Sequence, residues 1–137
     1  MTERPILIEE MARKRLKANA EMIDDRFMEL GCNSYVKTIY VGYDLDGEMV
    51  AALYPYADHV EIALAVPEDF EHPLLIDASH LTWRTLPLAA VVRIKSDAKQ
   101  MLPLIDAACR SVKEGSHNVH RENDYFVRSR KERRSQR

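Results

Sequence analysis

Three consecutive strand patterns between residues 35 and 66 constrain the fold of this chain more than any other feature. The first two patterns, residues 35–43 and 48–54, are rich in the β-branched and aromatic side chains that favour strands. Gly47 lies between them and supplies the positive φ that a hairpin turn commonly requires. The third pattern, residues 59–66, alternates in hydrophobicity. It places Val60, Ile62, Leu64 and Val66 on one face, and His59, Glu61, Ala63 and Ala65 on the other.

Two amphipathic helices are expected to flank these strands. The first spans residues 8–30 and ends at Gly31, because glycine adopts the left-handed conformation without steric penalty. Its apolar face is Leu16, Ala20, Ile23, Phe27 and Leu30, and its solvated face is Arg13, Lys14, Lys17, Glu21, Asp24 and Asp25. The second helix spans residues 97–113, with Ser96 as its N-cap. Pro103 predicts either a kink or a later start of that helix.

This order of elements predicts one α+β domain over residues 1–115, with helices on one face of an antiparallel sheet. A further strand at residues 89–95 turns Ala90, Val92 and Ile94 inward, which gives four to five strands in total. A short strand at residues 81–85 is an open alternative to a loop. Residues 116–137 form a basic C-terminal tail.

Composition excludes several classes of protein. Hydrophobic residues make up 46% of the 137, which is enough for a core. The sequence contains no run of about 18 apolar residues, the length that a membrane-crossing helix needs. The apolar run near the N-terminus is shorter than a signal peptide requires, so we expect a cytoplasmic protein. Cys32 and Cys109 are then expected to be reduced thiols, with Cys109 in the buried stripe of its helix.

The sequence predicts no catalytic residues, no metal and no cofactor. The four glycines never cluster into a phosphate-binding loop, and the five histidines lack the spacing of a metal site, which favours exposed or capping roles. Asp77, Ser79 and His80 are the residue types of a nucleophilic triad, but adjacent residues rarely assemble one, so local turn contacts are expected. An enzyme that uses the Asp77–Arg84 loop, with His80 as general base, remains an alternative.

His80, Trp83 and Arg84 are the candidate binding residues of the body. The tryptophan either caps the core or forms, with the arginine, an exposed contact surface of the kind found at interaction hot spots. A second candidate surface consists of tyrosines on the sheet face not covered by helices, where aromatic rings can stack on bases. Its members would be Tyr40, Tyr43, Tyr54 and Tyr56.

The element order, the His80–Trp83 segment and the Leu102–Ile105 run together resemble the small bacterial family called domain of unknown function 5655. Some members of that family are labelled predicted transport protein. More distantly, residues 35–112 resemble the MmcQ/YjbR group of helix–sheet–helix proteins. The family pattern has a glycine after the tryptophan, whereas this chain has Arg84 and Thr85 there. The resemblance implies a fold with no established activity, and fold alone does not give function.

Charge is divided between an acidic body and a basic tail. Residues 36–112 carry 6 Lys or Arg against 11 Asp or Glu, whereas residues 113–137 carry 8 against 4. The tail could bind phosphates of nucleic acid or an acidic partner, remain solvated, or dock Tyr125–Val127 onto a second copy. Its candidate contact residues are Arg128, Arg130, Lys131, Arg133 and Arg134.

The leading hypothesis from the sequence is a non-enzymatic binding or protein-interaction module that self-associates. It depends on the missing catalytic set, the well-patterned core and the Trp83–Arg84 loop. The alternatives are a weak nucleic-acid binder that uses the tail and an enzyme of unknown reaction.

Overall fold

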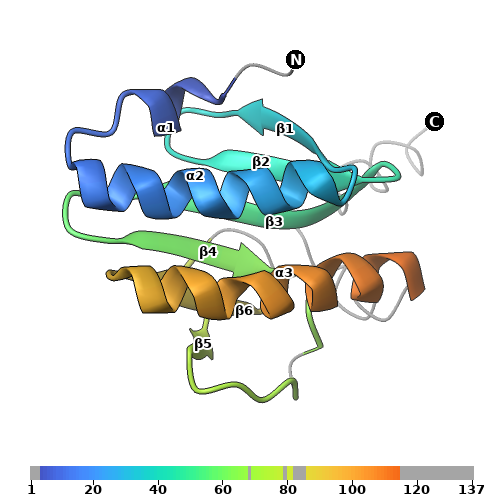
Figure 1. Ribbon diagram of the computed structural model, residues 1–137. Coiled ribbons are helices and arrows are strands. Elements are labelled where there is room, and N and C mark those ends of the chain that lie inside the picture. Colours follow the sequence, from blue (N-terminus) through green and yellow to red (C-terminus); the bar gives the residue numbers. More distant parts are fainter. Residues whose placement is uncertain (1–3, 68, 79, 82–85, 115–137) are drawn as a thin grey trace, which may run out of the picture.

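The computed structural model describes residues 4–67, 69–78, 80–81 and 86–114, and it has an α+β fold (Figure 1). All of its strand pairs are antiparallel, in the order β1-β2-β3-β4-β6-β5. The expected fold class is therefore confirmed, with six strands in place of four to five. The helices are α1 (Ile6–Glu9), α2 (Lys14–Glu29) and α3 (Lys95–Glu114). The strands are β1 (Asn33–Val36), β2 (Val41–Leu45), β3 (Glu48–Pro55), β4 (Val60–Leu64), β5 (Leu75–Asp77) and β6 (Leu88–Val92).

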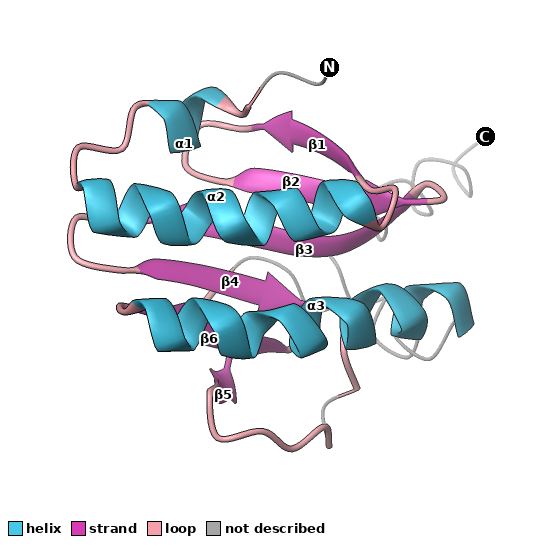
Figure 2. Cartoon of the chain, in the orientation of Figure 1, coloured by secondary structure: helices cyan, strands magenta, loops and turns pink. Residues whose placement is uncertain are grey.

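Helices α2 and α3 lie side by side across one face of the sheet (Figure 2). The core is between these two layers. Phe27 of α2 stacks on Tyr43 of β2 with ring centroids 4.1 Å apart. Alternating residues of β4 point toward the helices and meet the apolar stripes of α2 and α3. These residues are fully buried: Val60, Ile62, Leu64, Ala20, Ile23, Met101, Ile105 and Ala108. Burial of this apolar area is the main stabilising contribution to the fold.

The single strand expected at residues 35–43 is wrong, because the chain reverses within it. β1 and β2 form a hairpin in which Val36 pairs with Val41, and the N–H of Lys37 donates to the carbonyl of Tyr40. The turn residues, Thr38 and Ile39, include neither glycine nor proline, so the usual sequence signal of a turn is missing.

The second hairpin confirms the role expected of Gly47. Asp46 and Gly47 both have positive φ, at 53° and 81°, and Leu45 pairs with Glu48 across the turn. Two central residues with positive φ give a turn whose twist matches that of the flanking strands. The register then shifts between Tyr43 and Asp44, which leaves a bulge in β3.

The other edge of the sheet holds a strand that the sequence did not reveal. β5 pairs with β6, and β6 itself lies between β4 and β5. A short strand at residues 81–85 is not observed at Leu81, and residues 82–85 lie outside the described part of the chain. Ile94, expected to point inward, is 60% exposed because β6 already ends at Val92.

The first helix is shorter than expected and is preceded by a separate turn. Residues 10–13 are not helical, and they divide the expected helix into the short α1 and the longer α2. A continuous helix would place Ile8 about 80° around the axis from Leu16, whereas the break allows Ile8 to be completely buried. Asp24, expected on the solvated face, is also buried. The end of α2 at Glu29 confirms that Gly31, with φ of 86°, stops the helix.

The last helix begins at Lys95, so Ser96 is not its N-cap. Asp97 stabilises the helix start in its place, since its carboxylate accepts the N–H groups of Arg93 and Ile94. The helix continues through Pro103, which excludes the late start. Among the helices in the described ranges, none has the combined length and apolarity that a membrane crossing needs.

Candidate binding surface

The face of the sheet opposite the helices gathers aromatic, histidine and acidic side chains from β3, β4 and the turn that joins them. Successive side chains of a strand point to opposite faces. Tyr54 pairs with Glu61, and the N–H of Tyr56 donates to the carbonyl of His59. These four residues therefore share the face opposite that of Leu53 and its partner Ile62, which pack under the helices.

Glu61 is the buried acid of this surface. Its side chain is only 6% exposed, and its Oε1 lies 2.5 Å from Nε2 of His80, whose side chain is 49% exposed. A buried carboxylate is costly unless a hydrogen-bonding partner compensates it, and the imidazole provides one. His80 comes from the connection between β5 and β6, so this contact joins that connection to the middle of the sheet.

Tyr56 and His59 form a second ring pair at the β3–β4 turn. Their rings stack with centroids 4.6 Å apart, and Tyr56 is 43% exposed. Partial burial and the negative charge of Glu61 raise the pKa of Tyr56 above its ordinary value. Nδ1 of His59 lies 2.7 Å from the carboxylate of Asp58, and this hydrogen bond lowers the pKa of Asp58, with a smaller effect from Arg93. The hydrogen bond with Asp58 therefore holds the His59 ring, on which the Tyr56 ring stacks.

A tyrosine cluster lies beside Glu61 on the same face. The Tyr54 ring is 5.4 Å from the ring of Tyr40, and Tyr40 is 6.5 Å from that of Tyr35. Nζ of Lys37 lies 5.8 Å from the Tyr35 centroid, within the range of a cation–π contact. Burial is the main cause that raises the pKa of Tyr35.

The structure corrects the expected set of base-stacking tyrosines. Tyr43 lies on the opposite face, completely buried against Phe27. Tyr54 is on the expected face but only 3% exposed, so it offers little ring surface to a base. Tyr40 is partly buried, which leaves Tyr56 as the most exposed of the four.

Of the candidate binding residues in the body, the structure describes His80 alone. Trp83 and Arg84 lie outside the described residues, as do Ser79 and the tail residues Arg128, Arg130, Lys131, Arg133 and Arg134. His80 bonds to Glu61 on β4, a partner 19 positions away that the sequence did not indicate. The only available signal was one acidic residue, Glu61, near the start of the otherwise apolar run from Val60 to Val66.

His72 has the capping role expected for the histidines, since its Nδ1 accepts the N–H of Leu74 at 3.1 Å. Phe70, His72, Ile76 and Leu88 contribute to a shallow pocket beside β5, and His80 is not among its lining residues. Within the described ranges, no three His, Cys, Asp or Glu side chains converge as metal ligands would.

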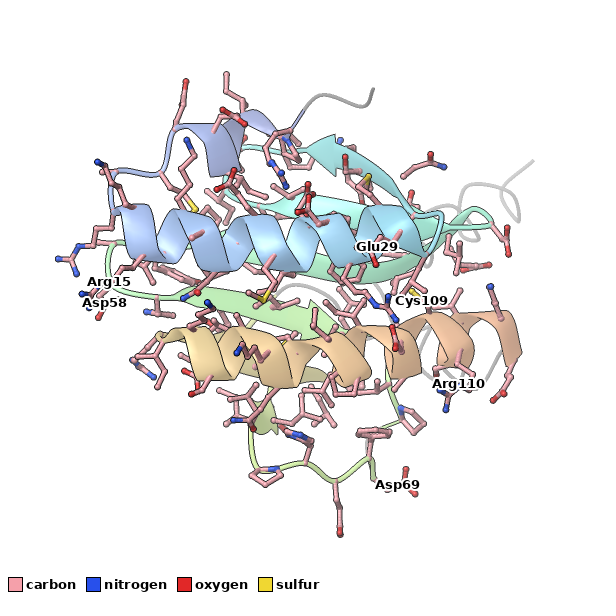
Figure 3. All side chains as sticks on the ribbon, viewed as in Figure 1. Arg15, Glu29, Asp58, Asp69, Cys109 and Arg110 are labelled. Carbon is pink, nitrogen blue, oxygen red and sulfur yellow. The ribbon has the colours of Figure 1, made fainter. Side chains whose placement is uncertain are left out.

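Side-chain positions over the whole described chain are drawn in Figure 3, where Asp58 lies at the left, at the β3–β4 end of the sheet, and Asp69 lies at the lower right, below α3. No protein-family model, curated protein or solved structure matches this sequence. The resemblance to the family of unknown function 5655 therefore stays a prediction.

Proposed function

We propose that this protein is a non-enzymatic interaction module that contacts a second copy of itself through the exposed residues at the β3–β4 end of the sheet face opposite the helices. One observation carries the proposal: an exposed Tyr56 ring stacked on His59 lies on the same face as the Glu61–His80 pair. We define the contact surface as Tyr56, Asp58, His59, His80 and Arg93.

The chemistry of this surface suits protein recognition. Aromatic and arginine side chains are enriched at interfaces, and an aromatic ring buries a large area with only two rotatable bonds. The stacking on His59 fixes the Tyr56 ring before any partner arrives, which lowers the entropy cost of binding. Glu61 likewise fixes the half-exposed His80 ring.

Charge favours a second copy as the partner. The side chain of Asp58 is 69% exposed, and exposed Arg93 is close enough to lower its pKa. A two-fold interface brings the same patch of both subunits together, so a charged patch is self-complementary when it carries both signs of charge. Asp58 of one copy could then face Arg93 of the other.

Sedimentation velocity over a range of protein concentrations tests this proposal. We expect a reversible dimer whose dissociation constant rises by about ten-fold or more in Tyr56→Ala, as for an interface hot spot. Ile39→Ala is the matched control, because Ile39 is 64% exposed on the β1–β2 turn, outside the contact surface. A monomer at every concentration, or an equal loss in the control, would rule out this interface.

The Glu61–His80 contact also favours a second candidate, catalysis with His80 as general base. A carboxylate that orients an imidazole is the arrangement by which many enzymes position a base. Hydrolysis of an activated ester is the simplest assay, with His59→Ala as control. If His80 acts as a base, His80→Ala should lose about 100-fold in rate. Equal rates for the two variants would exclude this candidate.

A further inference from the structure

The two cysteines of the chain meet in the interior. Sγ of Cys32 lies 3.7 Å from Sγ of Cys109, although 77 positions separate them. Both are free thiols, 5% and 4% exposed respectively. Figure 3 shows Cys109 on the side of α3 that faces the C-terminal end of α2, near Glu29.

Rigid elements hold both thiols in place. Cys32 comes three residues after the end of α2, where its N–H donates to the carbonyl of Phe27 and the N–H of Gly31 donates to that of Met28. These two bonds form the Schellman motif that commonly ends a helix. Cys109 is one of the buried residues of α3. One turn before it, Asp106 accepts two hydrogen bonds from Arg26 of α2, each 2.8 Å long.

The surroundings distinguish the two thiols. The hydrogen bond between the two thiols lowers the pKa of Cys109, assisted by Lys113 and Arg26 and opposed by burial and Asp106. The same bond, burial and the charge of Asp44 raise the pKa of Cys32. Cys109 is therefore the better nucleophile, because the thiolate is the reactive form of cysteine. Cys32 is the thiol that remains protonated beside it.

We propose that Cys32 and Cys109 are a modification site that forms a reversible disulfide when the protein meets a hydroperoxide. The Cys109 thiolate attacks the peroxide O–O bond, giving a sulfenic acid and, after protonation, one alcohol or water. The Cys32 sulfur then attacks the sulfenic sulfur, and the hydroxyl leaves as water with the Cys32 proton. Two thiols are oxidised, and one peroxide is reduced. A dithiol reductant reverses the change.

The consequence is a covalent link between the start of β1 and α3. Closing so long a loop restricts the unfolded chain, which stabilises the folded state. Both residues are almost fully buried, so the test uses hydrogen peroxide, the smallest hydroperoxide.

The test uses the reduced full chain with hydrogen peroxide in slight excess. We expect the intact mass to fall by about 2 Da, because two hydrogens leave as the bond forms. Non-reducing proteolysis should yield a peptide pair joined through Cys32 and Cys109, and dithiothreitol should separate it. The Tm should rise by about 5 °C or more.

The variant Cys32→Ser serves as the control, with circular dichroism to verify its fold. It should give a Cys109 sulfenic acid that dimedone traps, and no rise in Tm. Cys109→Ser should trap much less dimedone at Cys32. Wild-type protein that keeps both thiols, becomes over-oxidised, or forms the bond only in urea would overturn the proposal.

Discussion

The hydroxyl of Tyr43 on β2 donates a 2.6 Å hydrogen bond to Asp24 on α2, inside the helix–sheet interface. The other carboxylate oxygen of Asp24 accepts a 2.9 Å bond from Arg4. Burial is the largest cause that raises the pKa of Asp24, and the two hydrogen bonds oppose it. The pKa of Tyr43 is raised well above its ordinary value, mainly by burial and also by the charge of Asp24. These contacts tie the segment before α1 to the core.

Tyr43→Phe should destabilise the protein by about 1–3 kcal/mol, because it leaves a buried carboxylate oxygen without its donor. The free energy of unfolding from urea titration measures this loss. Tyr56→Phe, on an exposed ring, is the matched control and should change stability by less than about 0.5 kcal/mol. Similar values for both variants would contradict the structural role of the Tyr43–Asp24 bond.

Asp44→Asn should become progressively more stable than the wild type as the pH rises. Burial, followed by the nearby charge of Glu48, raises the pKa of Asp44 above its ordinary value. The folded state therefore keeps this proton to a higher pH than the unfolded chain does. The wild type loses stability as the pH rises between the pKa of Asp44 in the unfolded chain and its higher pKa in the folded protein, whereas the variant has no proton to lose at this position. Urea titrations of both proteins at about pH 4 and about pH 7 should show the difference growing. A constant or shrinking difference would contradict the burial of this carboxyl group.

Gly42→Ala should cost about 1 kcal/mol or more, because the new methyl group displaces a neighbouring ring. A Cβ at Gly42 would lie 2.1 Å from Cζ of Tyr35, its cross-strand partner. The penalty should largely disappear in a Tyr35→Ala background, where that space is empty. A double-mutant cycle on the free energy of unfolding checks this coupling. Additive effects would show that the ring and the methyl group do not compete.

The Arg26–Asp106 contact should couple α2 to α3 in a salt-dependent manner. Its two 2.8 Å bonds form the planar fork that arginine makes with carboxylates. A double-mutant cycle with Arg26→Ala and Asp106→Ala should give a favourable coupling at low ionic strength. This coupling should weaken at about 1 M salt, because both groups are partly exposed. Glu29→Ala removes the more exposed partner of Arg26 and should give a smaller coupling.

Nucleic-acid binding by the tail is a prediction of the sequence alone. If Arg128, Arg130, Arg133 and Arg134 contact phosphates, the affinity for DNA should fall with salt at a log–log slope near −0.9 per contact. Deletion of residues 121–137 should then abolish retention on DNA. Undiminished retention after that deletion would place the contacts elsewhere.

Several local features followed directly from residue type. The burial of Ile23, Phe27, Ile105 and Ala108 follows from their helical spacing, and Gly47 marked its turn by its conformational freedom. Glu61 shows where such reasoning stopped. Strand alternation put it on the face opposite Val60 and Ile62, which is correct, but alternation cannot say whether that face is covered. Its partner His80 belongs to a connection whose path no local pattern determines.

The sequence by itself determined the class of fold, because hydrophobic periodicity and turn residues act over a few neighbouring positions. Tertiary structure alone decided which distant groups meet: β6 between β4 and β5, His80 on Glu61, and the thiol of Cys32 against that of Cys109. The physical reason is that each of these contacts depends on how whole elements pack, and packing is set by the combined burial of many side chains rather than by any short segment.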